Sequence, residues 1–418
     1  MFRRYRLCVL MAVLAILVGS AQLVLADVAP PQQPPGESIG TGDIDTRVQM
    51  VSENVLVTVS QVERTPGGPQ TSADLTQGHV EATFEMRNQG DESESLDVWF
   101  PLGTGDGFFN VAVVENFVAE VNGVPTAITQ VELPGEFDMQ VPWATWPVTF
   151  LPGETVELTV SYDLRPTGYL PYGEFVYVLE TGAGWWGTIG EGTVAVRLPY
   201  DVTEQNVPFY STSAALDAPE IGGTDIVWHF TDLEPTQEEN IRVNVLIPSR
   251  WDAVQAAGAA VGKAPDSAQA YLSLAQAERA GLQFKYGLVC CDSLAASAVE
   301  HFQKALALGP DRIETHITYL DLMLSLWFPY DGTSYPADVP AVIASGLALN
   351  PTDAQLLDLV EQAAEIQYSS YEYSPDSETI QSDYQTLRAV LGDAAAANPG
   401  NARLQEIYEM LPETPGVG

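Results

Sequence analysis

The sequence predicts two successive architectures, an antiparallel β-sandwich followed by an array of helical repeats. From residue 48 to about residue 250, short runs alternate apolar and polar residues, are rich in valine, threonine and aromatics, and are separated by proline, glycine and asparagine. Beyond Trp251 the apolar spacing changes to the helical period, in segments rich in alanine and leucine. No helical pattern separates the early runs, which excludes βαβ units and favours antiparallel pairing.

Length and charge limit the classes of function. The 418 residues suffice for two or three domains. Acidic residues number 56 against 17 lysines and arginines, giving a formal charge of -39, yet 46% of the chain is hydrophobic. The apolar content is too high for a disordered acidic tail. Because nucleic acids and anionic membrane surfaces are bound by basic surfaces, we expect neither as a partner.

The first 26 residues are typical of a secretory signal peptide. Arginines near the start precede an apolar run of about a dozen residues, and small residues end the segment at Ala26. An uncleaved N-terminal anchor is the alternative, since residues 7–26 carry no charge. Residues 27–47 are rich in proline and glycine and read as a linker. We therefore expect an extracytoplasmic protein with no membrane span after cleavage.

The β region, residues 48–250, contains one clear turn and one conspicuous aromatic pair. Asn122-Gly123 lies between alternating runs and predicts a hairpin, because both turn positions need positive φ. Trp185 and Trp186 lie between glycines in an expected loop. Either one tryptophan covers the end of the sandwich, or the pair forms an exposed platform for a sugar ring or peptide. We take both as candidate binding residues.

Several β segments follow one another in a characteristic order, including "VEATFEMRNQGDESESLDVWFPL", "FLPGETVELTVSYDL" and "YVLETGAGWWGTIGEGTVAVRLP". In this order they resemble an uncharacterised exported bacterial domain of the DUF4424-like type. The most specific stretch is Thr181–Ile189, which holds the two tryptophans. The resemblance implies export and a β architecture, and that family carries no established activity.

Residues 251–412 are expected to form the helical repeats, with 413–418 as a tail. Prolines at 265, 310, 351 and 399 are 45, 41 and 48 residues apart, and each follows an alanine- or leucine-rich helical segment. The pattern resembles the tetratricopeptide repeat. Positions that match its packing residues are Tyr271, Leu274, Ala275, Ala298, Phe302, Ala305 and Pro310.

Three insertions lengthen these repeats beyond the standard length, and we expect them as loops along one edge of the array. They are "GLQFKYGLVCCDS", "WFPYDGTSYPAD" and "QYSSYEYSPDSET". Tyrosines mixed with acids and glycines are typical of recognition surfaces, whereas the alternative is that these aromatics cap the core. The candidate binding residues are Trp327, Tyr330, Tyr335, Tyr371 and Tyr373.

No constellation predicts a metal, a cofactor or catalytic residues. Cys290 and Cys291 are adjacent; two thiols, a vicinal disulfide, and a metal or redox role all remain open. His79 and His229 are expected in different strands and His301 and His316 on successive helices, as ordinary polar surface groups. Calcium at acidic loops is an alternative to having no cofactor, although no loop has the EF-hand ladder of ligands.

The functional prediction is an exported, non-enzymatic interaction or scaffold protein that binds a protein or peptide partner through its helical repeats. Whether it is an enzyme stays open, with the balance against it. One alternative is an extracytoplasmic hydrolase of cell-surface glycan or peptide, with Glu180 and Glu191 as acid and base. Another is a passive cell-surface spacer. The sequence predicts no oligomeric state.

Overall fold

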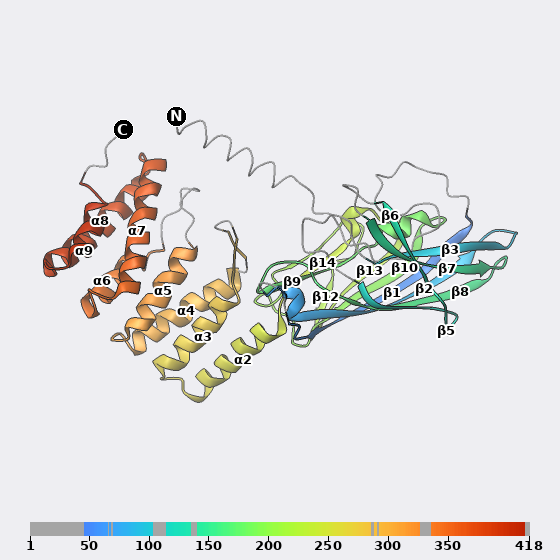
Figure 1. Cartoon of the computed structure of the whole chain (residues 1–418), viewed down its shortest axis with the longest axis horizontal. Helices are drawn as coiled ribbons and strands as arrows, with labels where there is room; N and C mark the ends of the chain where they lie inside the picture. Colours follow the sequence, from blue (N-terminus) through green and yellow to red (C-terminus); the bar gives the residue numbers. More distant parts are fainter. Residues whose placement is uncertain are drawn as a thin grey trace. The chain divides into compact units, whose positions relative to one another are not determined.

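The computed structural model describes residues 46–65, 67, 70–102, 114–134, 140–285, 288–290, 292–326 and 336–413. They divide into two compact units. The first comprises the described residues up to Gly168, with Gly173–Val202 and Phe209–Val245. The second comprises Tyr169–Tyr172, Thr203–Pro208 and the described residues from Leu246 onward. The first is built of strands and the second of helices, which confirms the predicted order (Figure 1). The signal peptide predicted at 1–26 lies outside the described residues.

The larger sheet of the first unit has the strand order β12-β13-β10-β1-β2-β8-β4-β5. Its pairs are antiparallel except β1 with β10, which run parallel and so depart from the purely antiparallel sandwich that the sequence predicts. Its strands are β1 Val48–Gln61, β2 Thr76–Asn88, β4 Val114–Val121, β5 Val124–Pro125, β8 Thr155–Leu164, β10 Ile189–Arg197, β12 Glu220–Gly222 and β13 Asp225–Leu233.

Two three-stranded sheets, in the orders β3-β7-β6 and β11-β14-β9, pack against the larger one. Ring contacts join Phe100 of β3 to Tyr162 of β8, and Tyr210 of β11 to Trp228 of β13. The fully buried aromatics of this unit therefore lie between two layers, as in a sandwich. The strands are β3 Glu94–Pro101, β6 Thr129–Pro134, β7 Gln140–Phe150, β9 Tyr172–Tyr177, β11 Phe209–Tyr210 and β14 Ile241–Leu246.

Alternation along the strands gives the larger sheet one apolar and one polar face. In β2, Val80, Ala82 and Phe84 are buried, while the residues between them are polar. The register aligns the polar residues of neighbouring strands in rows. One row runs across six strands and consists of Asp225, Arg197, Thr58, His79, Asp163 and Glu115.

The predicted hairpin turn at Asn122-Gly123 is confirmed. It joins β4 to β5, and both residues have positive φ, 52° and 72°. Glycine adopts this conformation without cost and asparagine tolerates it better than most residues.

The second unit is a series of helices whose ends the sequence marks. The residues Pro265, Pro310, Pro351 and Pro399 each follow the end of a helix by two positions. The helix after each begins at a capping side chain in three cases, Ser267, Asp353 and Asn401. The helices are α2 Pro248–Lys263, α3 Ala268–Ala280, α4 Asp292–Leu308, α5 Ile313–Leu326, α6 Val339–Leu349, α7 Ala354–Tyr373, α8 Glu378–Ala397 and α9 Ala402–Glu409.

Two of the three predicted insertion loops have a different structure. The first contains a short hairpin, β15 Gln283–Lys285 with β16 Leu288–Cys290. The third is not a loop, because α7 continues through Tyr373. No glycine or proline interrupts the chain before Pro375, and Ala363, Gln367 and Ser370 extend the buried stripe at helical spacing. Most of the second insertion lies outside the described residues. Among the helices that the structure describes, none is long and apolar enough to cross a membrane.

Candidate functional site

The structure separates the two candidate tryptophans of the β unit. Trp185, which follows the short 3-10 helix Glu180–Gly184, is buried. Trp186 is 40% exposed, and the guanidinium of Arg47 lies 5.9 Å from its ring centre. They therefore do not form one platform, and a binding role for Trp186 stays a prediction. Of the proposed acid and base, Glu191 is exposed on β10, and the side chain of Glu180 lies outside the described part of the chain.

The candidate aromatic edge of the helical unit is described only at its last two members. Tyr371 is half-buried against the ring of Tyr384, with 5.0 Å between ring centres, whereas Tyr373 at the end of α7 is 63% exposed. Trp327, Tyr330 and Tyr335 lie outside the described residues, as do the side chains of Cys290 and Cys291.

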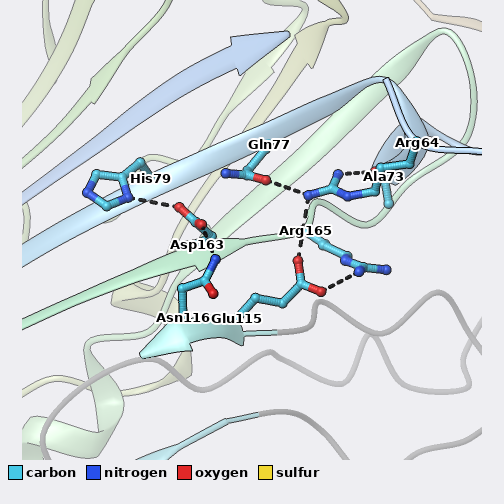
Figure 2. Close-up of polar contacts among 8 residues, drawn as sticks. All are labelled: Arg64, Ala73, Gln77, His79, Glu115, Asn116, Asp163 and Arg165. Carbon is cyan, nitrogen blue, oxygen red and sulfur yellow. Dashed lines mark hydrogen bonds and ion pairs between the residues drawn. The ribbon is translucent and has the colours of Figure 1, made fainter. Parts of the chain in front are cut away.

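A polar cluster that the sequence does not predict occupies the polar face of the larger sheet (Figure 2). It consists of two arginines, a histidine, two carboxylates and two amides contributed by β2, β4, β8 and the segments that follow β1 and β8. Its members are Arg64, Gln77, His79, Glu115, Asn116, Asp163 and Arg165. Pairing of β2 with β8 sets His79 opposite Asp163, and pairing of β8 with β4 sets Asp163 opposite Glu115.

The centre of this cluster is an imidazole held by a carboxylate. His79 Nδ1 lies 2.9 Å from one carboxylate oxygen of Asp163, and the amide nitrogen of Asn116 donates to the other at 2.7 Å. Asn116 has a φ of 55° at an irregularity in the pairing of β4, a conformation that asparagine tolerates. Half of the His79 side chain is exposed, while Asp163 is largely covered. The second ring nitrogen of His79, Nε2, therefore lies on the accessible side of the pair.

The environment of Asp163 favours its ionised form. Partial burial by itself raises the pKa of this carboxyl, but the hydrogen bonds from Asn116 and His79 and the positive charges of His79 and Arg64 lower it further, so the pKa lies below its usual range. Asp163 is therefore a carboxylate at neutral pH. It can hold the ring of His79 in one orientation and stabilise a positive charge on it.

Beside this pair, two guanidinium groups converge on Glu115. Arg165 contacts one oxygen of the carboxylate, and Arg64 Nη2 lies 3.6 Å from the other. Arg64 is fixed by two further contacts, to the carbonyl oxygen of Ala73 at 2.6 Å and to the side-chain oxygen of Gln77. The cluster thus places fixed positive charge next to a histidine that a carboxylate orients (Figure 2).

Several titratable groups are buried outside this cluster, among them Glu53, Glu278 and His316. Glu53 of β1 is wholly buried and accepts a hydrogen bond from Tyr177 Oη at 2.7 Å. In the helical unit, the buried carboxylate of Glu278 accepts from Ser297 Oγ at 2.6 Å and pairs with His301 Nδ1 at 2.8 Å. His316 is also buried, against the prediction of a surface group, and its ring nitrogen contacts the carbonyl oxygen of Arg312. Because burial excludes substrate from Glu53, we treat it as a determinant of stability.

The His79 cluster was missed because its members are far apart in the sequence. His79 and Asp163 are 84 residues apart, and each is one polar residue in an alternating strand. The only signal was the polar position of His79 in "GHVEATFEM". In the described part of the chain, no group of three or more histidine, cysteine, aspartate or glutamate side chains is placed to hold a metal ion.

No family model matches the chain, and no curated protein matches it. Among solved structures, the chain is similar to a nutrient-binding candidate from Legionella pneumophila, at 17% identity over 66% of this chain and 83% of that one, with a TM-score of 0.40. It is also similar to an M1 zinc metallopeptidase from Deinococcus radiodurans, at 14% identity over 89% and 97%, with a TM-score of 0.26. A polysaccharide lyase, BACCELL_00875, is similar at 11% identity over 80% and 67%, with a TM-score of 0.19.

These likenesses are too distant to carry any protein's chemistry to this chain. They nevertheless correct the main functional prediction, a non-enzymatic protein that binds a partner through its helical repeats, which is wrong. The finding against that prediction is that the solved structures that match include several of the metallopeptidase and one of the lyase.

Proposed function

We propose that the protein is an extracytoplasmic hydrolase that cleaves an amide or ester bond in cell-surface peptide or glycan, with water as the nucleophile and His79 as the general base. The observation that carries this proposal is the contact of His79 Nδ1 with the ionised carboxylate of Asp163, which leaves Nε2 on the accessible side. This arrangement is the base and orienting pair that hydrolytic sites use.

In the proposed reaction, His79 Nε2 takes a proton from water as the water oxygen bonds to the carbonyl carbon of the substrate. The carbonyl π electrons move to the oxygen and form an oxyanion. When the carbon-nitrogen or carbon-oxygen bond then breaks, the imidazolium returns its proton to the leaving group. Atoms and charge balance without any further reactant. Asp163 does not touch the substrate and acts as a positioning residue that stabilises the transient imidazolium.

Arg64 supplies the positive charge for the oxyanion. Its contacts with the Ala73 carbonyl and Gln77 hold the guanidinium in place before the substrate arrives. A donor fixed in advance requires no reorganisation as the charge develops, and for this reason preorganised groups contribute strongly to catalysis.

The first prediction is that hydrolysis depends on His79 and not on histidine in general. The purified chain is incubated with short peptides and with acylated cell-wall glycans, and new termini and released acids are measured by mass spectrometry. We expect His79→Asn to lower the rate by about 100-fold or more, the usual contribution of a general base. Asp163→Asn should also lower it strongly and shift the pH profile, because the amide can donate to Nδ1 and leave the ring proton on Nε2, where the base is needed.

His229 offers a matched control. It lies on the same face of the sheet, in β13, but its ring nitrogen contacts the hydroxyl of Thr193 at 3.1 Å and, among the residues that the structure describes, no carboxylate. The variant His229→Asn should keep the wild-type rate. A His79→Asn protein with full activity, or a wild-type protein that cleaves none of these substrates, would contradict the proposal.

Two finer assignments belong to the same proposal. Export rests on the predicted signal peptide, residues 1–26. The tetratricopeptide likeness of the helical unit rests on its packing residues, of which Ala275, Ala298, Phe302 and Ala305 are fully buried.

A further inference from the structure

Positive charge is scarce in the β unit, and a third of its arginines reach one carboxylate. Between residues 46 and 245 the chain has no lysine and six arginines. Two of these, Arg64 and Arg165, contact Glu115. In a chain with a formal charge of -39, the cluster sets these two guanidiniums against two carboxylates, Glu115 and Asp163, and so repels an anion less than the rest of the surface does.

Of the two arginines, Arg165 has the donors to spare. Arg64 already donates to a carbonyl and an amide oxygen in addition to its ion pair. Arg165 reaches Glu115 through one nitrogen, and its Nε is buried and has no acceptor among the described residues. About a third of the Arg165 side chain is exposed. A guanidinium offers five N–H donors and favours two-point contact with a carboxylate. The single contact with Glu115 therefore leaves most of the donors of Arg165 unused by that carboxylate.

We propose that Arg165 binds the terminal carboxylate of a peptide substrate, which replaces Glu115 at this guanidinium while Glu115 keeps its ion pair with Arg64. This inference rests on the proposed hydrolase and narrows its substrate class to peptides with a free C-terminus. Glu115 then acts as the internal partner that occupies the site until substrate arrives.

The position of Arg165 predicts where the peptide is cut. Arg165 follows Asp163 by two residues, immediately after the end of β8, and two residues of extended chain span at most about 7 Å. An extended peptide spans about 3.5 Å per residue. A terminal carboxylate at Arg165 therefore places the first or second peptide bond from the C-terminus near His79, and the product is a single amino acid or a dipeptide.

Charge favours a peptide over an acidic glycan. A polyuronate carries a carboxylate on every sugar, and a protein with 56 acidic residues repels such a chain. A peptide terminus brings one carboxylate, which the guanidinium of Arg165 matches, and the rest of its backbone is neutral.

The test measures binding apart from catalysis. The full chain with His79→Asn, which leaves the peptide intact, is titrated by calorimetry with tri-alanine, with tri-alanine amide and with trigalacturonate. We expect the free acid to bind about tenfold or more tightly than the amide, the effect of a charge-assisted hydrogen bond. This comparison requires no substitution at Arg165. Arg165→Gln should abolish the preference, and Glu115→Gln should tighten binding of the acid several-fold by removing its competitor.

Arg197 provides the control variant. It lies in the same row of the sheet, in β10, and its guanidinium makes two contacts with Asp225, at 2.8 and 2.9 Å. Arg197→Gln should leave the acid preference unchanged. Equal binding of acid and amide, tighter binding of trigalacturonate, or weaker binding in Glu115→Gln would each overturn the inference. If the acid binds through Arg165 but the wild-type chain cleaves no peptide, the hydrolase proposal is wrong and the carboxylate site stands.

Discussion

Glu53 shows how a single residue can set the pH dependence of the fold. Its carboxyl lies in the core of the β unit, where burial raises its pKa and the hydrogen bond from Tyr177 lowers it, with a net rise from 4.5 to about 8. Between these two values the folded state keeps a proton that the unfolded state has lost. Stability therefore falls as pH rises from about 4.5 to about 8, by an amount on the order of a few kcal/mol.

We expect Glu53→Gln to remove this component, because glutamine does not ionise. The difference in unfolding free energy between the variant and wild type should be more favourable to the variant at pH 9 than at pH 5, as measured by urea unfolding at both values. Comparing variant with wild type cancels the general repulsion of an acidic chain at high pH. Asn54→Ala, at an exposed position of the same strand that does not ionise, serves as control and should show no such difference. A constant effect of Glu53→Gln at both pH values would contradict the assignment.

The burial of Glu53 also marks a limit of sequence analysis. Val48 and Met50 face the core at even positions, whereas Val55 and Val57 face it at odd ones. The alternation therefore predicts an irregularity in the strand between Met50 and Val55, but not at which residue it lies. The structure puts the shift between Met50 and Ser52, where a bulge turns Glu53 inward. The same holds for His79 and Asp163, because the register that joins them depends on strand pairing across the whole sheet.

At the scale of elements, local signals in the sequence predict where helices end and turns lie better than they predict whether a segment is helix or loop. The prolines after α2, α4, α6 and α8 and the turn at Asn122-Gly123 are local, and the structure confirms them. The tyrosines and serines of the third insertion predict a loop, but the first residue there that stops a helix is Pro375. Composition alone therefore misassigned a helix that buried positions extend.

The contact between α3 and α4 supplies a prediction at this scale. Ser297 and His301 lie one turn apart on α4 and both reach the buried carboxylate of Glu278 on α3. The hydrogen bond to Glu278 raises the pKa of His301, burial lowers it, and the nearby charges of Glu278 and Glu300 raise it, with a net rise. Because the folded pKa is raised, protonated His301 stabilises the fold fully below pH 6.5, and this contribution is lost as pH rises through the folded value.

His301→Gln should therefore cost more stability at pH 6 than at pH 9. The measurement is the thermal midpoint followed by circular dichroism at helical wavelengths. Thr386→Ala, at an exposed position of α8 that does not ionise, should cost the same at both values. If His301→Gln lowers the thermal midpoint equally at the two pH values, the ring of His301 stabilises the fold by packing and not by its charge.

At the scale of the whole molecule, the boundary between the units is not one cut in the chain. The sequence predicts that the helical domain begins at residue 251. In the structure, Tyr169–Tyr172 and Thr203–Pro208 belong to the helical unit although they precede it in the chain. The backbone N–H of Leu246 donates to the carbonyl of Asn206, that of Ile247 to Pro171, and Ser293 Oγ donates to the carbonyl of Glu204.

The last prediction follows from these hydrogen bonds. A fragment of residues 246–418 keeps the helices and their buried stripes, so we expect it to be helical by circular dichroism. It lacks the partners of Leu246, Ile247 and Ser293, and each lost hydrogen bond costs about 1 kcal/mol. The helical signal of the fragment should therefore melt at a lower temperature than that of the intact chain. Amide hydrogen exchange should be faster in α2 and α4, which lie at the lost hydrogen bonds, than in α7 and α8, which take no part in them. A fragment with intact-chain stability would mean that the helices alone define the unit, whereas one without helical signal would mean that the two preceding segments are required for it to fold.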